Sequence, residues 1–518
     1  MMMQFIKKKE FYFFLLIILG HTIPALIFTF FPSLDGPAHL YNSTIIVDLL
    51  SNNEGVLSEF IVFNSELVPN WIGHFILALF NTIGGPIFAE KGFLLLYLFG
   101  FPLSFRFMLK QLSPNYKVYS YTIFPFLFSN LFCLGFYNFS FAFIFLFLII
   151  GFTVKSLQKR INLKSFLSLF CLLFLMYISH IVVYGIGLFI ISSIALLNYE
   201  HGWKRRIKNC FGILASASFT LVLSILYFSS RTSSDSSKRF IESSELFSNL
   251  LDNTSLIAYN HEIESTYTQF ITWSILALVI LPILYTYIKP NSISFSEFLK
   301  RKLIWIALPF IMLGALFILP NESGGAGYVS IRFQYLFFLF LLPLGASLRL
   351  SSFLRISLIA IMLISSFGLQ LYYTKVSRDL NQMAKSIESM ADKVKSTDII
   401  LPLNFKATWI NNHFSNYLGI KETPLILSNY ELSTNYFPLH WKENENFRKF
   451  RGTLNSFHES EEKVEELMNY SKTIFNTVLI IGEIPEDKKY ESLRSTLKNN
   501  FDLQNSNELC SVYKKKLP

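Results

Sequence analysis

The sequence is poor in charged residues and in cysteine, and each shortage excludes a class of protein. Charged residues make up only 15% of the 518 positions, well below the usual quarter of a soluble domain. The four cysteines form no CxxC pair and no Cys/His cluster, so they indicate neither a disulfide framework nor a zinc site. Walker motifs, Rossmann glycine patterns and internal repeats are also absent from the sequence, so its motifs give no support for a P-loop, dinucleotide-binding or repeat protein.

Apolar residues are abundant instead. The composition is 52% hydrophobic and 17% aromatic, with 56 phenylalanines. Many apolar runs reach the ~20 residues that a helix needs to cross a bilayer. Residues 1–31 lack a small-residue cleavage site and are therefore interpreted as a first span, not a signal peptide. The sequence predicts a polytopic α-helical membrane protein.

The net charge of +10 is interpreted as the positive-inside bias of a membrane protein, not as a sign of nucleic-acid binding. Lys7, Lys8 and Lys9 place the N-terminus in the cytoplasm. Only one reading keeps the later basic loops inside as well: residues 32–86 form one long outer loop with helices lying on the membrane surface. Residues 1–373 then form a transmembrane domain of about eleven spans. The expected spans are Phe11–Phe31, Ile87–Leu109, Val118–Cys133, Phe139–Val154, Ser165–Ser179, Ile181–Leu197, Phe211–Phe228, Gln269–Ile288, Leu303–Leu319, Arg332–Arg349 and Ile356–Tyr373.

The C-terminal segment, residues 374–518, has the composition of a soluble domain and follows an outward span. We therefore predict an extracytoplasmic α/β domain of ordinary size. The expected strands are the short apolar runs Thr397–Leu403, Thr423–Leu427 and Thr477–Ile481. The expected helices are Lys375–Val394, Glu461–Tyr470 and Lys488–Asn500.

Four polar residues fall at the outer ends of the expected spans, although the basic loops alone set the topology. They are Asp35, Asn138, His180 and Arg332. Polar groups at membrane depth are costly and usually face a cavity or a partner. Their gathering on one face favours a catalytic vestibule over a through-pore, which needs polar groups at several depths.

The first outer loop opens with Asp35-Gly36-Pro37-Ala38-His39. Asp35 is the candidate general base, because a carboxylate near a low-dielectric cleft has a raised proton affinity; the alternative is a helix N-cap. His39 follows one helical turn later and is a candidate for contacting a phosphate or hydroxyl, with a buried hydrogen-bonded histidine as the alternative. His74 is expected to be an interfacial residue.

Candidate substrate-binding residues occur further along the chain. Asn138 is a site residue or a turn residue, and His180, between two short spans, contributes to a site or to helix packing. Arg332 follows the glycine-rich run Gly324–Tyr328 and is expected to bind an anion in preference to snorkelling. Arg231 and His261 lie in a basic outer loop that either closes over a phosphorylated lipid headgroup or is simply solvated.

The pattern resembles the GT-C superfamily of integral-membrane glycosyltransferases, which includes protein O-mannosyltransferases and aminoarabinose transferases. The resemblance is closest to a poorly characterised bacterial branch. It rests on Asp35-x-Pro37-x-His39-Leu40, on Gly135-Phe136-x-Asn138, on the later His180, and on the stretches Asn429-Tyr430-Glu431 and Tyr436-Phe437-Pro438.

This resemblance implies an inverting transfer of a hexose or pentose from a polyprenyl-phosphate-linked donor to a lipid, glycan or protein acceptor. Asp35 stands in the position of the family's base. The family often has paired acids in this loop, whereas here Gly36 follows Asp35. No cofactor is therefore assigned, and a divalent metal is possible but not indicated. The implied location is the bacterial cytoplasmic membrane.

Three other functions remain open. A polymerase or ligase of surface polysaccharide outside the GT-C superfamily would also use lipid-linked sugars, but would rely chiefly on arginine and histidine. A transporter or flippase of lipid-linked glycans predicts polar residues in mid-membrane and an internal repeat. A non-catalytic scaffold predicts that substitution of Asp35, His180 or Arg332 leaves function intact.

Overall fold

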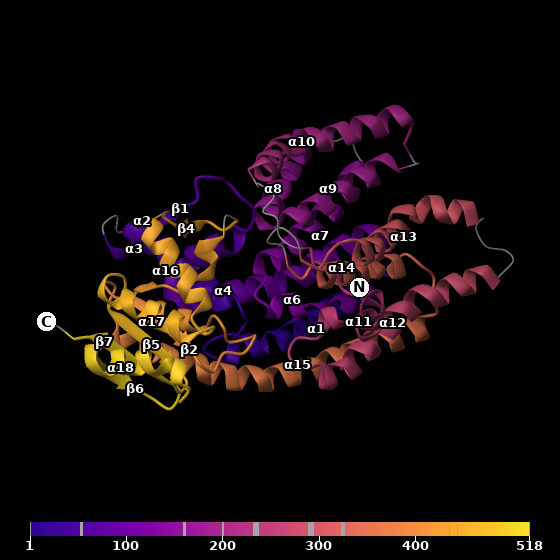
Figure 1. Cartoon of the computed structure of the whole chain (residues 1–518). Helices are drawn as coiled ribbons and strands as arrows, with labels where there is room; N and C mark the ends of the chain where they lie inside the picture. The colour runs from indigo at the N-terminus through magenta and orange to yellow at the C-terminus, as the bar shows by residue number, and fades with distance from the viewer. Residues whose placement is uncertain are drawn as a thin grey trace. The chain divides into compact units, whose positions relative to one another are not determined.

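A computed structural model describes residues 2–51, 55–158, 162–198, 201–230, 238–288, 295–322, 327–434, 436–442 and 444–516 (Figure 1). By its internal contacts the chain divides into two compact units. Unit 1 comprises Met1–Pro24 and Leu95–Lys375, and unit 2 comprises Ala25–Leu94 and Val376–Pro518. Three helices contribute residues to both units: α1 (Met2–Ile27), α4 (Ile72–Leu112) and α15 (Ser352–Glu388). The predicted division into a membrane domain and an extracytoplasmic domain stays a prediction.

Unit 1 is otherwise built from helices. They are α5 (Tyr116–Tyr119), η1 (Ser120–Phe126), α6 (Asn130–Cys133), α7 (Tyr137–Leu157), α8 (Leu163–Ser179), α9 (Ile181–Leu196), α10 (Trp203–Ser229), α11 (Ser243–Asp252), η2 (Thr254–Leu256), α12 (His261–Ile288), α13 (Phe295–Ile318) and α14 (Val329–Ala346). Helices α8, α9 and α10 lie side by side, as Figure 1 shows in magenta. Helix α14 packs against α12 and α13.

Seven helices in the described part of the chain are long and apolar enough to cross a membrane. They lie within Lys9–Ile27, Ile72–Leu112, Tyr137–Leu157, Trp203–Ser229, His261–Tyr285, Val329–Ala346 and Ser352–Lys393. Three shorter apolar helices accompany them: Leu163–Ser179, Ile181–Leu196 and Lys302–Ile318. The prediction of a polytopic helical membrane protein is therefore confirmed.

Two expected spans differ in detail from the structure. Residues 118–133, expected as one span, fold instead as the short pieces α5, η1 and α6, because Pro125 interrupts the run and Ser129 caps a new helix at Phe132 N. Residues 72–112 form one helical element that is broken at Gly85, where φ is 80°. Glycine tolerates this left-handed backbone, so the element is divided into two helical parts at Gly85, close to the start of the expected span at Ile87.

Unit 2 contains all the β-structure assigned to named strands. Its short helices are α2 (Gly36–Ser51), α3 (Val56–Phe60), η3 (Ala391–Lys393), η4 (Phe414–Gly419), η5 (Tyr430–Ser433), α16 (Glu445–Ser456), α17 (Glu461–Asn469), η6 (Tyr470–Lys472), η7 (Lys488–Tyr490) and α18 (Glu491–Asn500). Its strands are β1 (Ile61–Phe63), β2 (Ile399–Asn404), β3 (Leu425–Ile426), β4 (Leu439–Trp441), β5 (Thr477–Ile481), β6 (Phe501–Ser506) and β7 (Cys510–Lys515).

Five of these strands form one sheet in the order β3-β2-β5-β7-β6. Strand β2 pairs in parallel with β3 and β5, whereas β7 is antiparallel to β5 and β6. Every residue of the central strand β5 is buried, as expected of a continuous apolar run between two neighbours. In Figure 1 the yellow C-terminal segment shows α17 and α18 beside these strands.

Residues 32–86, predicted as the first outer loop, are an integral part of unit 2. Strand β1 pairs antiparallel with β4, with Val62 opposite His440. Helix α2 packs against η4, and the hydroxyl of Tyr41 on α2 donates a hydrogen bond to the carbonyl of Pro424. These contacts bring the Asp35 stretch next to the segment 413–431, which is distant in sequence.

Candidate active site and metal-ligand cluster

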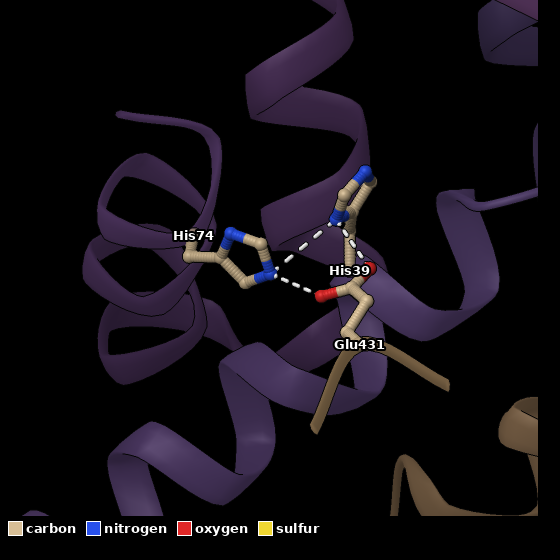
Figure 2. Close-up of side chains that lie close together, drawn as sticks. All are labelled: His39, His74 and Glu431. Carbon is tan, nitrogen blue, oxygen red and sulfur yellow. Dashed lines mark hydrogen bonds and ion pairs between the residues drawn. The ribbon is translucent and has the colours of Figure 1, made fainter. Parts of the chain in front are cut away.

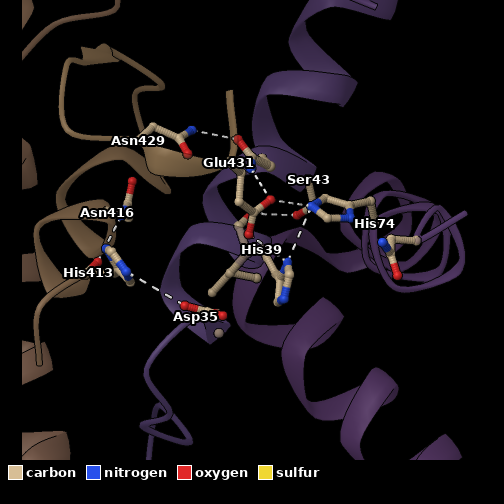
Figure 3. A network of polar contacts seen from close by, with 12 residues as sticks. Asp35, His39, Ser43, His74, His413, Asn416, Asn429 and Glu431 are labelled. Carbon is tan, nitrogen blue, oxygen red and sulfur yellow. Dashed lines mark hydrogen bonds and ion pairs between the residues drawn. The ribbon is translucent and has the colours of Figure 1, made fainter. Parts of the chain in front are cut away.

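Asp35 lies directly before α2. The backbone N–H of His39 donates to the Asp35 carbonyl at 3.0 Å, which begins the helix. The buried backbone amide of Gly36, in the first turn, donates to Ser33 Oγ at 3.1 Å, so the turn is capped from another residue. The Asp35 carboxyl group instead accepts a hydrogen bond from the hydroxyl of Tyr430, and its Oδ1 lies 3.6 Å from Nε2 of His413 (Figure 3).

The electrostatic setting of Asp35 suits proton transfer at neutral pH. Burial raises the pKa of its carboxyl group to about 7, although the charge of His39 and the hydrogen bond from Tyr430 act in the opposite direction. Nearby Glu431 adds to the increase. A carboxylate whose pKa lies near the working pH is well matched to general base catalysis. The direction of this shift agrees with the raised proton affinity expected for Asp35, whose role as a general base stays a prediction.

Two aromatic rings hold this carboxyl group in place. His413 stacks on Tyr430 with ring centroids 4.4 Å apart. Burial lowers the pKa of His413 to about 4, so this ring is neutral at pH 7. Burial and the neighbouring Asp35 raise the pKa of Tyr430 well above its ordinary value, so its hydroxyl stays protonated and remains a donor to Asp35.

A second group of polar side chains meets in unit 2 (Figure 2). His39 on α2 and His74 on α4 both approach the carboxylate of Glu431 on η5. Nδ1 of His39 lies 2.8 Å from Oε1, and Nε2 of His74 lies 2.7 Å from Oε2. The same two nitrogens are 3.3 Å apart. The side chains are 5%, 1% and 0% exposed, in the order His39, His74 and Glu431.

Glu431 is ionised within this group. Burial alone would raise the pKa of its carboxyl group, but the charges and hydrogen bonds of His39 and His74 outweigh burial and hold that pKa well below its ordinary value. The amide of Asn42 donates to Oε2, and Asn429 in turn donates to Oδ1 of Asn42 at 2.7 Å. A chain of two carboxamides therefore fixes the orientation of the carboxylate.

The histidine pair of this group was only partly anticipated. His39 is the buried, hydrogen-bonded histidine that the sequence left open as an alternative. His74, expected at the membrane interface, is 1% exposed and contacts Glu431. That expectation is wrong, because an amphipathic pattern cannot reveal a buried carboxylate 357 positions further along the chain.

Two of the other predicted residues, His180 and Arg332, meet in unit 1. His180 lies in extended conformation (φ −161°, ψ 122°) between α8 and α9. One terminal nitrogen of Arg332, in the first turn of α14, lies 3.3 Å from its Nε2. The Arg332 guanidinium also lies 4.9 Å from the ring of Phe136 and 5.7 Å from that of Phe139. The structure thus brings His180 and Arg332 together.

This arrangement fixes the state of His180. A guanidinium group offers only donors, so Nε2 of the imidazole must accept, and the hydrogen of a neutral ring is then on Nδ1. Nδ1 is buried and has no hydrogen-bond partner among the described residues. Asn138 is buried in the first turn of α7, between Phe136 and Phe139 in the sequence. The turn before it depends on Gly135, whose φ is 84°.

The remaining predictions have separate outcomes. His261 is exposed, and its Nε2 lies 3.0 Å from Oδ2 of Asp252, so its described contact is a surface ion pair. Arg231 and the residues Gly324–Ala326 lie outside the described residues. The meeting of Asp35 with Arg332 in one cavity stays a prediction.

No protein-family model matches the sequence, and a comparison with curated proteins finds no significant match. The helices, however, are those of a multi-pass membrane protein, and the fold is similar to that of a protein of known structure. The chain is similar to ArnT from Cupriavidus metallidurans in two solved structures. The structure bound to undecaprenyl phosphate has a TM-score of 0.55 and 9% sequence identity, and the apo structure has 0.54 and 10%. In both cases 97% of each chain is covered.

Proposed function

We propose that the protein is a membrane glycosyltransferase that moves a sugar from a polyprenyl-phosphate donor to an extracytoplasmic acceptor with inversion of configuration. The observation that carries the proposal is the buried carboxyl group of Asp35, whose pKa is raised to about 7. Such a group accepts a proton from a hydroxyl near neutral pH. The GT-C-like fold supports the same class of reaction.

The proposed step is a single displacement. The Asp35 carboxylate takes the proton of an acceptor hydroxyl while the acceptor oxygen forms a bond to the anomeric carbon. The bond from that carbon to the phosphate oxygen breaks, and polyprenyl phosphate leaves with the bonding electrons. Attack from the face opposite the leaving group inverts the anomeric configuration.

The leaving phosphate is assigned to Arg332 and His180. The guanidinium group is permanently charged and has several donors in a planar fork, which suits phosphate oxygens. The N–H at Nδ1 of His180 adds a buried donor that has no partner among the described residues. Undecaprenyl phosphate is bound by the structurally similar ArnT, and we infer the same lipid class for this chain.

The test is release of polyprenyl phosphate by the full-length protein in detergent or lipid nanodiscs. The probes are undecaprenyl-phosphate sugars with hexose, pentose and aminopentose heads, and release is followed by mass spectrometry. We expect release from at least one donor, and a loss of about 10²-fold in kcat/KM for Arg332→Ala, on the order of removing one charge-stabilising donor.

Arg355→Ala is the matched control, because Arg355 also lies over an aromatic ring, 6.0 Å from that of Tyr119. It should leave kcat/KM within about twofold, as expected for a residue outside the site. Absence of release from every donor, or equal losses in the two arginine variants, contradicts the proposal.

A further inference from the structure

Three potential metal ligands converge in unit 2, outside the proton-transfer role assigned to Asp35. Among the described residues, the ligand atoms of His39, His74 and Glu431 all lie within 4.8 Å of one another. The three side chains come from α2, α4 and η5, so only the folded unit assembles them. Figure 2 shows both ring nitrogens directed toward the carboxylate.

The spacing of the two nitrogens fits a shared cation. In a tetrahedral zinc site with Zn–N bonds of about 2.0–2.1 Å, two nitrogen ligands are about 3.3–3.4 Å apart. The observed separation of His39 Nδ1 and His74 Nε2 is 3.3 Å. The 2.7 Å contact of His74 with Oε2 is a direct hydrogen bond, and the 2.8 Å contact of His39 with Oε1 is a direct ion pair. A small rotation of the carboxylate lengthens both distances to ligand spacing.

The positions of the hydrogen atoms in the cluster also favour a shared cation. When each imidazole donates to the carboxylate, two N–H groups face each other at the 3.3 Å separation of their nitrogens. A cation between the two nitrogens removes this repulsion: each neutral imidazole then carries its single hydrogen on its other ring nitrogen, any surplus proton is released to solvent, and the two facing nitrogens form coordinate bonds. The buried carboxyl group of Glu431, which lies within 2.8 Å of both histidines, then supplies the negative ligand that the cation needs.

We propose that Nδ1 of His39, Nε2 of His74 and the Glu431 carboxylate bind one zinc ion. Two imidazoles and one carboxylate are a ligand set typical of zinc sites that keep a fourth position for water or substrate. Magnesium and calcium prefer all-oxygen surroundings and fit this set poorly. Asn42, which donates to Oε2, orients the carboxylate from outside the coordination sphere.

The ion also organises the proposed base. Glu431 directly follows Tyr430, whose hydroxyl donates to Asp35. Fixing Glu431 to α2 and α4 therefore fixes the donor that holds the Asp35 carboxyl group. Zinc binding itself does not depend on the proposed sugar transfer; only this positioning effect rests on it.

The experiment measures metal directly. Full-length protein, purified through a histidine-free affinity tag, is analysed for zinc by inductively coupled plasma mass spectrometry. We expect about one zinc ion per wild-type chain and a loss of at least tenfold in His74→Ala and in Glu431→Gln. His413→Ala removes a neighbouring histidine that is not among the three ligands, and it should retain the zinc.

A second readout separates loss of the site from loss of the fold. Wild-type protein stripped with a chelator and reloaded with Co²⁺ should show the visible absorption bands of a tetrahedral site and a higher melting temperature. Glu431→Gln protein that elutes as a folded monodisperse species should show neither change. Folded wild-type protein that contains no zinc, binds no Co²⁺ and melts at an unchanged temperature overturns the proposal, whatever the outcome of the transferase assay.

Discussion

At the scale of single residues, the surroundings of Asp35 disfavour the ionised form of its carboxyl group and raise its pKa. Burial is the largest influence on its pKa, and the favourable charge of His39 and the Tyr430 hydrogen bond offset burial only in part. A structural aspartate at a helix start would gain from accepting the first amides of the helix. Here Ser33 takes the Gly36 amide, which leaves the carboxyl group available for proton transfer.

The raised pKa of Asp35 predicts how activity depends on pH. Only the carboxylate can accept a proton, and with a pKa of about 7 the reactive fraction falls as pH decreases below that value. We expect kcat/KM to decrease about tenfold per pH unit below 7 and to be constant above it. A pH–rate profile of the wild-type enzyme from pH 5.5 to 9 checks this. A profile that is flat from 6 to 8, or that rises toward acid, rules out Asp35 as the base.

At the scale of secondary-structure elements, α2 is held to the C-terminal segment by close packing. The ring of Tyr41 is fully buried, and its hydroxyl accepts from the Ile426 backbone N–H at 3.1 Å. A Cβ atom at Gly419, the last residue of η4, would lie 2.5 Å from this ring. Glycine is therefore required here for the approach of two elements, and this contact positions the start of α2.

Gly419→Ala is expected to lower the melting temperature by several degrees, because overpacking a buried contact costs about 1–3 kcal/mol. Gly452→Ala is the control, since the added Cβ meets no atom within 4 Å on α16. It should stabilise that helix by about 0.5–1 kcal/mol. Thermal unfolding followed by intrinsic fluorescence measures both variants. A melting temperature of Gly419→Ala at or above the wild-type value would show that the Tyr41 contact does not constrain α2.

The elements also show what local patterns can predict. Strand β5 was predicted with correct bounds, because Thr477 is followed by four apolar residues that lie between two other strands. Strand β6 was missed, because Phe501–Ser506 is mostly exposed at the sheet edge and reads as polar sequence. Residues 118–133 were wrongly predicted as a span, because they are as apolar as one and the local signals that divide them, Pro125 and the Ser129 cap, were not weighed against that.

At the scale of the whole molecule, unit 2 joins two separate parts of the chain. Its site could therefore be predicted only for residues that lie close to one another in the sequence. Asp35 and His39 share one short motif and were identified directly. The resemblance indicated the stretch around Tyr430 and Glu431, but it gave these residues no role. His413 and the involvement of His74 depend on contacts across hundreds of positions, which no periodicity or spacing in a single sequence encodes.

For the whole molecule, the proposed function depends on a single carboxyl group. A multi-pass helical fold similar to that of ArnT accounts for the apolar spans, and Asp35 is the group on which the proposed chemistry depends. Asp48 lies on the same helix as the residues after Asp35 and is only half-buried. It is a matched acid outside the site, so the two positions separate a catalytic effect from a general effect of removing a negative charge.

The most direct measurement is therefore the rate of polyprenyl-phosphate release from an active lipid-linked sugar by Asp35→Asn and Asp48→Asn protein in proteoliposomes. The account predicts that Asp35→Asn lowers kcat by about 10²–10⁴-fold, the usual contribution of a general base, whereas Asp48→Asn stays within about twofold of wild type. Equal rates for wild-type and Asp35→Asn protein of matched folded content would contradict it.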